Sequence, residues 1–193
     1  KAQKIIENAR ILIGGRRALA DYSHSGAREC AIGADIPGVL AFIREALAED
    51  DVVVMVSGDP GYYSLLDALR RTFPIGQIEV IPGISSLQLA FARLALPWHN
   101  ARLLSFHGRE PLETELVRTE GAVLGMLTDG RNNSQTIAAR LLACGWRDED
   151  AMYVCTRLSY ANEHILTTTL GAAKDDRGIG HGVIVVCAHE ETI

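Results

Sequence analysis

The sequence predicts an α/β protein of two domains, in which a parallel α/β half is followed by a mixed α+β half. Two apolar runs, residues 52–56 and 78–81, carry the first part of this prediction. Both are rich in β-branched side chains without polar alternation, as is typical of parallel strands covered on both faces. Each run ends in a glycine-containing turn before a helical pattern. Three later strand-like runs have little helix between them, which favours antiparallel pairing.

The first half alternates between expected helices and strands. Pro74 and Gly76 stop one helix, and Ser85 or Ser86 is placed to cap another, because a serine hydroxyl accepts from the unpaired N–H groups of a first helical turn. In order, we expect a helix at 2–8, a strand at 10–13, a helix at 36–48, a strand at 52–56, a helix at 62–73, a strand at 78–81 and a helix from Ser85 or Ser86 to Leu94.

The segment Leu96-Pro97-Trp98-His99-Asn100 interrupts this pattern, so we place the domain boundary there, with domains at 1–98 and 99–193. In the second half, Asn132-Asn133-Ser134 is expected to cap a helix that Gly145 ends. The expected elements are strands at 101–106 and 122–127, a helix at 135–144, and strands at 152–156, 163–170 and 182–188.

Composition indicates a globular protein with no large nucleic-acid surface. The 193 residues are 48% hydrophobic and 22% charged, and the formal net charge is −5. An acidic balance disfavours nucleic acid as a partner. No apolar run approaches the length of a membrane span, and the sequence lacks an N-terminal signal pattern. We therefore expect no nucleic-acid partner, no membrane partner and a cytoplasmic location.

The cysteines and histidines show no metal-ligand spacing. Cys30, Cys144, Cys155 and Cys187 are scattered singly, and the histidines do not cluster. We expect neither a metal site nor a disulfide framework, which fits a reducing compartment. The chain also shows no nucleophile elbow.

The turns after the two apolar runs form the first candidate site, because ligands of open α/β sheets bind outside the carboxyl ends of the strands. Gly58 lacks a Cβ and permits close approach of a ligand, and the Asp59 carboxylate can accept from a ligand amino or hydroxyl group. A helix-capping role explains Asp59, Ser85 and Ser86 equally well. Both interpretations stay open.

Several short segments together resemble the tetrapyrrole methylase family over nearly the whole chain. They are Ser57-Gly58-Asp59-Pro60, Ile81-Pro82-Gly83-Ile84-Ser85-Ser86, Leu103-Leu104-Ser105-Phe106-His107-Gly108-Arg109, Leu127-Thr128-Asp129 and Gly180-His181-Gly182-Val183-Ile184-Val185-Val186. The Ser-Phe-His-Gly-Arg piece favours the branch of the family that methylates C5 of precorrin-7 or its cobalt form. Members of the family begin with a strand and a glycine-rich loop. This chain starts at the helix that should follow them, so the first strand is expected to be missing.

The resemblance implies a methyltransferase that uses S-adenosylmethionine, releases S-adenosylhomocysteine and acts on a corrin precursor. It also implies a homodimer. Methyl transfer from a sulfonium to an enamine-like carbon depends mainly on holding the two at near-attack distance and excluding water. Such a reaction requires no metal or covalent nucleophile. The sequence does not single out a catalytic base.

The resemblance also implies roles for individual residues. Tyr63, His107 and Arg109 would contact the tetrapyrrole, with Arg109 pairing with a peripheral carboxylate in a fork geometry. A surface location explains His107 and Arg109 equally well, and the tyrosines could simply pack beneath the macrocycle. The implied cofactor contacts are Ser57, Gly58, Asp59, Tyr62, Ser85, Ser86, Thr128, Asp129, Leu158, Gly182 and Val183.

Two other functional classes stay open. One is a different enzyme of the same fold, acting on another tetrapyrrole position, on diphthamide precursor protein as a diphthine-type methylase, or on ribosomal RNA. The acidic charge disfavours RNA, and the segment at 105–109 disfavours the others. The other class is a truncated, non-catalytic domain that binds a partner. Failure to bind S-adenosylhomocysteine would favour this second class.

Overall fold

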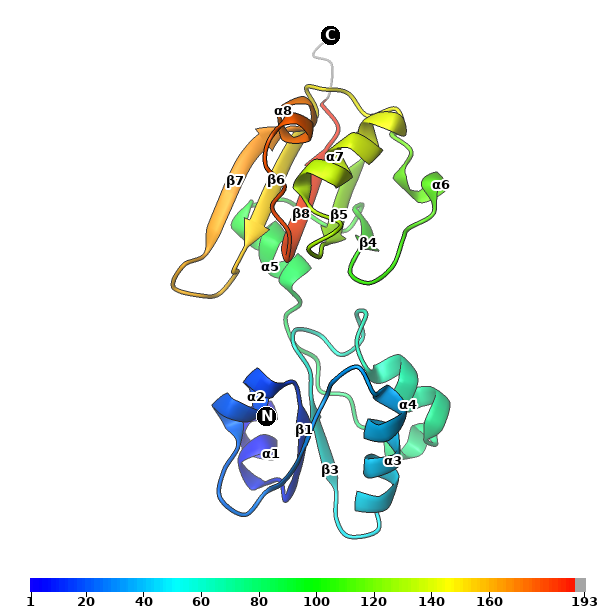
Figure 1. The fold of residues 1–193 in the computed structure, drawn as a ribbon, viewed down its shortest axis with the longest axis vertical. Helices are drawn as coiled ribbons and strands as arrows, with labels where there is room; N and C mark the ends of the chain where they lie inside the picture. Colours follow the sequence, from blue (N-terminus) through cyan, green and yellow to red (C-terminus); the bar gives the residue numbers. More distant parts are fainter. Residues whose placement is uncertain (190–193) are drawn as a thin grey trace. The chain divides into compact units, whose positions relative to one another are not determined.

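The computed structural model describes residues 1–189 and divides the chain into two compact units, Lys1–Ser85 and Ser86–Ile193 (Figure 1). We describe each unit by itself. The division falls earlier in the chain than the boundary expected after Trp98. The physical reason is the helix α5, Ser86–Arg93, which packs on the sheet of the second unit.

The first unit is built on a parallel sheet of three strands, in the order β2-β1-β3. The central strand β1 is buried on both faces. Leu12 packs with Leu19 and Met55 in one core cluster, whereas Ile13 packs with Val39 and Ile43 in another. The elements are α1 Ala2–Asn8, β1 Ile11–Gly14, α2 Arg16–Tyr22, β2 Arg28–Ala31, α3 Ile36–Ala46, β3 Val52–Met55, α4 Leu66–Thr72 and the 3-10 helix η1 Ile75–Gln77.

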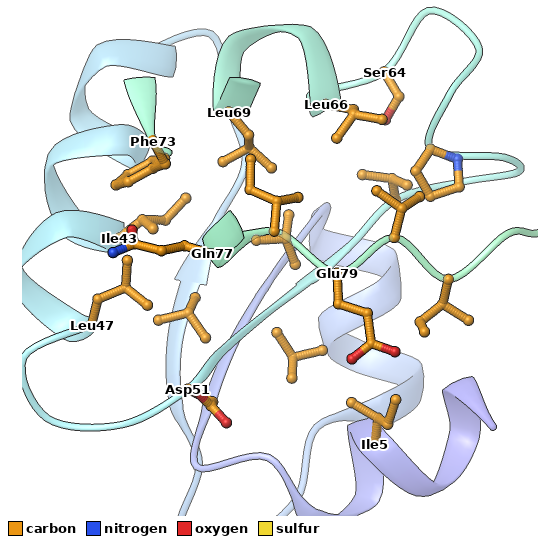
Figure 2. Close-up of a pocket in the computed structure, with 18 residues that line it drawn as sticks. Ile5, Ile43, Leu47, Asp51, Ser64, Leu66, Leu69, Phe73, Gln77 and Glu79 are labelled. Carbon is orange, nitrogen blue, oxygen red and sulfur yellow. The ribbon is translucent and has the colours of Figure 1, made fainter. Parts of the chain in front are cut away.

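The strand expected at 78–81 does not form, and that prediction was wrong. The segment has no strand partner among the described residues, although its sequence is strand-like. Residues 77–81 and the β3 valines Val52, Val53 and Val54 line one cavity of about 350 Å³. Figure 2 shows the side chains of this cavity, which also come from α3 and α4. Because the cavity lies beside β3, residues 78–81 run past this strand without pairing with it.

The second unit is a mixed sheet of five strands, in the order β4-β5-β8-β6-β7. The pair β4 and β5 is parallel, and β8 pairs antiparallel with both β5 and β6. The antiparallel pairing expected for the three late strands is confirmed, since β6 also pairs antiparallel with β7. The elements are α5 Ser86–Arg93, β4 Arg102–Ser105, α6 Glu113–Leu116, β5 Val123–Leu127, α7 Ser134–Ala143, β6 Ala151–Thr156, β7 His164–Thr169, α8 Leu170–Asp175 and β8 Gly182–Cys187.

Helices cover both faces of this mixed sheet. The helices α7 and α8 close one face over a core that includes Leu124, Met126 and Ile184. On the opposite face α5 approaches so closely that a Cβ on Gly125 would lie 2.8 Å from the Phe91 ring. Glycine at this position therefore allows helix-to-sheet contact without displacing Phe91. Among the described residues no helix is long and apolar enough to cross a membrane.

Five short elements were not expected, namely α2, β2, the 3-10 helix η1, α6 and α8. The strand expected to continue to Leu170 ends at Thr169, because the Thr169 hydroxyl accepts from the Ala172 N–H and caps α8. The helix expected at 62–73 begins only at Leu66.

Candidate functional site

The turn after β3 is tied directly to the loop before α5 by Asp59. One carboxylate oxygen of Asp59 accepts from the Gly61 N–H at 2.8 Å, and the other accepts from the Gly83 N–H at 3.1 Å. Asp59 thus stabilises its own turn and holds the two glycine-containing loops together. The helix-capping interpretation was incomplete, because α4 starts later, at Leu66.

The backbones of these two loops are in close contact. Gly58 has φ +76°, and a Cβ there would lie 3.3 Å from the Ser85 Cα. A Cβ on Gly83 would lie 2.5 Å from the Gly58 carbonyl oxygen, which is shorter than any real contact. Both positions therefore require glycine, and the predicted residues Ser57, Gly58, Asp59 and Ser85 lie at one place. Ser86 follows as the first residue of α5.

The two tyrosines of the first unit lie just beyond this turn. Their rings meet edge to face, with centroids 4.7 Å apart. Tyr63 is 44% exposed and has φ +47°, an uncommon conformation for an aromatic residue. The Tyr63 side chain is therefore presented to solvent from a strained backbone.

In the second unit, Thr128 joins the end of β5 to the start of β8. Its hydroxyl donates to the Gly182 carbonyl at 3.1 Å and accepts from the Gly182 N–H at 2.9 Å. A Cβ on Gly182 would lie 2.4 Å from the Cys155 carbonyl oxygen, so this position also requires glycine. Val183 is buried within β8, paired with Cys155 and Leu127. Its side chain therefore belongs to the core.

The carboxylate of Asp129 accepts from the backbone of two loops. One oxygen takes the N–H groups of Arg131 and Asn132, and the other takes the Gly108 N–H at 3.1 Å. The N–H groups of Asn132 and Gly108 are the main reasons that the pKa of Asp129 is lowered to about 2. Asp129 is ionised at neutral pH and fixes the loop after β4.

His107 lies in that same loop, immediately after β4. Its Nδ1 is 3.4 Å from the Thr128 carbonyl oxygen, and its backbone N–H donates to the Ser105 hydroxyl. The Asn132 side-chain amide donates to the Phe106 carbonyl at 3.0 Å. The residues 105–109 are thus anchored to the loop after β5, with His107 and Arg109 on the exposed side.

Leu158 lies in the connection between β6 and β7, where two flanking residues have left-handed backbones. Arg157 has φ +50° and Ser159 has φ +69°. The Glu163 carboxylate accepts from the Ser159 N–H at 2.7 Å and from Arg93 Nε at 2.6 Å. The ion pair with Arg93 lowers the pKa of Glu163. This pair links α5 to the loop that carries Leu158.

All of these second-unit residues lie at one end of the strands of the sheet, which we call the site edge. The parallel strands β4 and β5 end there, β6 ends there and the antiparallel strand β8 begins there. His181, directly before β8, has φ +57°, and its Nε2 is 3.2 Å from the position that a Cβ on Gly130 would occupy. Strained non-glycine residues of this kind concentrate at functional sites. Within residues 1–189 no group of three potential metal ligands is found.

Four residues that contribute to the site edge were not assigned to the site from the sequence. Asn132 was assigned to a helix cap, although its side chain supports the loop after β4. Glu163 and Arg93 are far apart in sequence and carry no motif. A signal was available for His181 alone, because it stands between two glycines at the start of the closing strand.

The model of the Tetrapyrrole (Corrin/Porphyrin) Methylases matches residues 1–174 of this chain. The chain belongs to the tetrapyrrole methylase family. A curated relative, the cobalt-precorrin-7 C(5)-methyltransferase of Salmonella typhimurium, is 32% identical over 184 residues, covering 95% of this chain and 90% of the relative. The family expected from the sequence is thereby confirmed.

Solved structures of this methylase family have the same fold. The precorrin-6Y methylase of cobalamin biosynthesis from Archaeoglobus fulgidus matches with a TM-score of 0.71 and 25% identity, over 97% of this chain and 89% of that one. The uroporphyrin-III C-methyltransferase of Thermus thermophilus, solved with S-adenosyl homocysteine, gives a TM-score of 0.71 at 22% identity, over 95% and 88%. The expected α/β fold, with a parallel and a mixed sheet, is confirmed.

Proposed function

We infer that this chain is an S-adenosylmethionine-dependent methyltransferase of cobalamin biosynthesis, which transfers a methyl group to C5 of precorrin-7 or cobalt-precorrin-7. The observation that carries this proposal is the similarity to the Salmonella typhimurium enzyme, because it extends over nearly the full length of both chains. The anchored segment 105–109, which pointed to the same branch of the family, lies at the same end of the second-unit sheet as the other predicted residues of that unit.

We propose that the two glycine loops of the first unit hold the methyl donor. Gly58 and Gly83 bring their backbones within a distance that any Cβ would disturb, and Asp59 fixes their separation. S-adenosylmethionine supplies an electrophilic methyl group on a sulfonium. We propose Ser57, Gly58, Asp59, Tyr62 and Ser85 of these loops as cofactor contacts, together with Ser86 at the start of α5. The family resemblance supports the same role for Thr128, Asp129, Leu158, Gly182 and Val183 of the second unit.

Geometry suggests how the second-unit residues would contribute. The side chain of Val183 is buried in the sheet and the acceptors of Asp129 are occupied by backbone N–H groups. We therefore assign backbone contact to Gly182 and Val183, and a loop-fixing role to Asp129. For the substrate we propose Tyr63, His107 and Arg109, with the Arg109 guanidinium pairing with a carboxylate of the tetrapyrrole.

Methyl transfer and ligand binding test this function separately. We expect the chain to bind S-adenosylhomocysteine in a calorimetric titration and to transfer one labelled methyl group from S-adenosylmethionine to cobalt-precorrin-7 or precorrin-7. Comparison of the two substrates decides which form is used. Binding without transfer to either would contradict the C5 assignment and favour another position or substrate. Absence of both binding and transfer would favour a non-catalytic domain.

We also propose a homodimer and a cytoplasmic location. The family resemblance supports the homodimer, and sedimentation equilibrium of the purified chain tests it. The four cysteines form no disulfide with one another, a pattern typical of reducing compartments. Cell fractionation with an antibody against the chain tests the location.

A further inference from the structure

We propose that Nε2 of His107 accepts the proton that the substrate loses during methyl transfer. This inference rests on the proposed function and adds to it a catalytic base. It also assigns His107 a role beyond contact with the tetrapyrrole.

A proton acceptor follows from the balance of the reaction. The electron pair of an enamine-like ring carbon forms the new C–C bond, while the S–CH₃ bond breaks and its electron pair stays on sulfur as a neutral thioether. The positive charge of the sulfonium passes to the substrate. Loss of one proton from the substrate to a base returns it to neutrality, and a positioned base accelerates such a step.

His107 stands where a ligand of this sheet is expected. It follows β4, whose carboxyl end lies beside that of the parallel strand β5. Ligands of parallel strands bind outside such carboxyl ends. The imidazole is on the exposed side of the loop, so its free nitrogen is accessible to a substrate.

The surroundings of the ring determine which nitrogen is free. The Thr128 carbonyl can only accept, so the Nδ1 that lies 3.4 Å from it carries the hydrogen in the neutral ring. The lone pair is then on Nε2. This carbonyl is itself held in place, because the Thr128 N–H and hydroxyl both bond to Gly182.

The backbone on both sides of the imidazole is also fixed. The His107 N–H donates to Ser105, and the next N–H, that of Gly108, donates to Asp129. The preceding carbonyl, that of Phe106, accepts from Asn132. A general base gains from such positioning because proton transfer requires a short approach in one direction.

The other charged groups of these loops are less suited to accept a proton. Both oxygens of Asp129 already accept backbone N–H groups, and the guanidinium groups of Arg109 and Arg131 are donors with no acceptor atom. His181, packed against Gly130, is the second histidine of this edge. Among the residues 105–109, 128–132 and 181–182, only the two histidines carry an imidazole, whose neutral form keeps one nitrogen lone pair that can accept a proton.

The first test uses the free protein. In ¹⁵N-labelled protein, the imidazole nitrogens of His107 should show the Nδ1–H tautomer, with an unprotonated Nε2, in the neutral form of the ring. The opposite tautomer would overturn the proposal. The exposed histidine His99 serves as the reference for an imidazole without a fixed acceptor.

The second test is chemical rescue in the methyl-transfer assay. We expect His107→Ala to bind S-adenosylhomocysteine like the wild type but to lose about 100-fold or more in kcat, and added imidazole to restore part of that loss. His107→Gln keeps hydrogen bonding and should be as slow as His107→Ala. His99→Ala is the matched control and should turn over normally.

The outcomes separate this inference from the proposed function. Wild-type protein that transfers no methyl group would contradict the function itself. With active wild type, a His107→Gln variant of normal kcat, or a His107→Ala variant that imidazole does not rescue, would overturn the role as base. If His181→Gln loses kcat while His107→Gln does not, the base is His181, and the role proposed for His107 is overturned.

Discussion

The Gly108 N–H donates to the Asp129 carboxylate over 3.1 Å, and this bond joins the loop after β4 to the loop after β5. The same carboxylate accepts from Arg131 and Asn132. One ionised side chain therefore fixes the positions of His107 and Thr128 relative to each other.

Asp129→Asn should make the stability of the folded protein less sensitive to acid. The pKa of Asp129 is about 2 in the folded protein, below the ordinary value of about 3.9 in an unfolded chain. Its contribution to stability is therefore complete above about pH 4 and is lost as the pH falls towards 2. Thermal unfolding followed by circular dichroism at several pH values should show a larger loss of stability between about pH 4 and pH 2 in the wild type than in the variant. Asp175→Asn, at the exposed end of α8, should behave like the wild type.

Gly83→Ala should weaken S-adenosylhomocysteine binding about ten-fold or more, since its Cβ would lie 2.5 Å from the Gly58 carbonyl oxygen and force the two loops apart. Calorimetric titration measures the change. Gly33→Ala is the matched control, because a Cβ there meets nothing within 4 Å. Unchanged affinity in Gly83→Ala with an intact thermal transition would contradict the assignment of these loops to the cofactor.

Arg118→Met should lower the free energy of unfolding by about 3–5 kcal/mol, because it leaves the fully buried Asp150 carboxylate without its cation. Arg118 Nε lies 2.8 Å from Asp150, which also accepts from the N–H groups of Arg147 and His189. Urea denaturation measures the change. Arg10→Met removes the exposed pair with Asp50 and should cost no more than about 1 kcal/mol. Equal effects of the two variants would refute this contrast.

Glu163→Gln should loosen the loop that carries Leu158. The charged acceptor of the Ser159 N–H and of Arg93 is replaced by a neutral amide, which weakens both bonds. We expect the Ser159 amide to exchange its hydrogen about ten-fold faster or more. Hydrogen exchange followed by NMR measures the rate. The exposed Glu149→Gln should leave Ser159 unchanged, and a rate unaffected in Glu163→Gln would show that Arg157 and Ser159 hold their conformations without this pair.

The sequence predicted every described strand except β2, and the predicted strands include the edge strands β3, β4 and β7. The runs that became β3, β5 and β8 were predicted, because strands covered on both faces lack polar alternation. The strand β2 was missed because its residues alternate between half-buried and exposed, with Arg28 paired to Glu45 and Glu49. Residues 78–81 carry the buried-strand pattern but have no partner, and pairing is a long-range property that a local pattern does not contain.

The motifs located the site loops, whereas the contacts between them required the structure. Gly58 and Asp59 were identified as turn residues from the sequence. That Gly83 requires glycine because of the Gly58 carbonyl follows only from their approach across the fold. Likewise, the sequence offered Asp129 as a cofactor contact, and only the structure shows that backbone N–H groups occupy its oxygens.

The pairing of β3 has a practical consequence for solutions of this protein. Among the described strands, β3 pairs only with β1, so its other edge carries backbone donors and acceptors without a strand partner. That edge adjoins the apolar cavity beside residues 78–81. Uncovered edges with apolar surroundings are where separate molecules add to one another's sheets and aggregate. Concentrated samples are therefore expected to aggregate through this strand, and dilution or a lysine on its outer edge should reduce this aggregation.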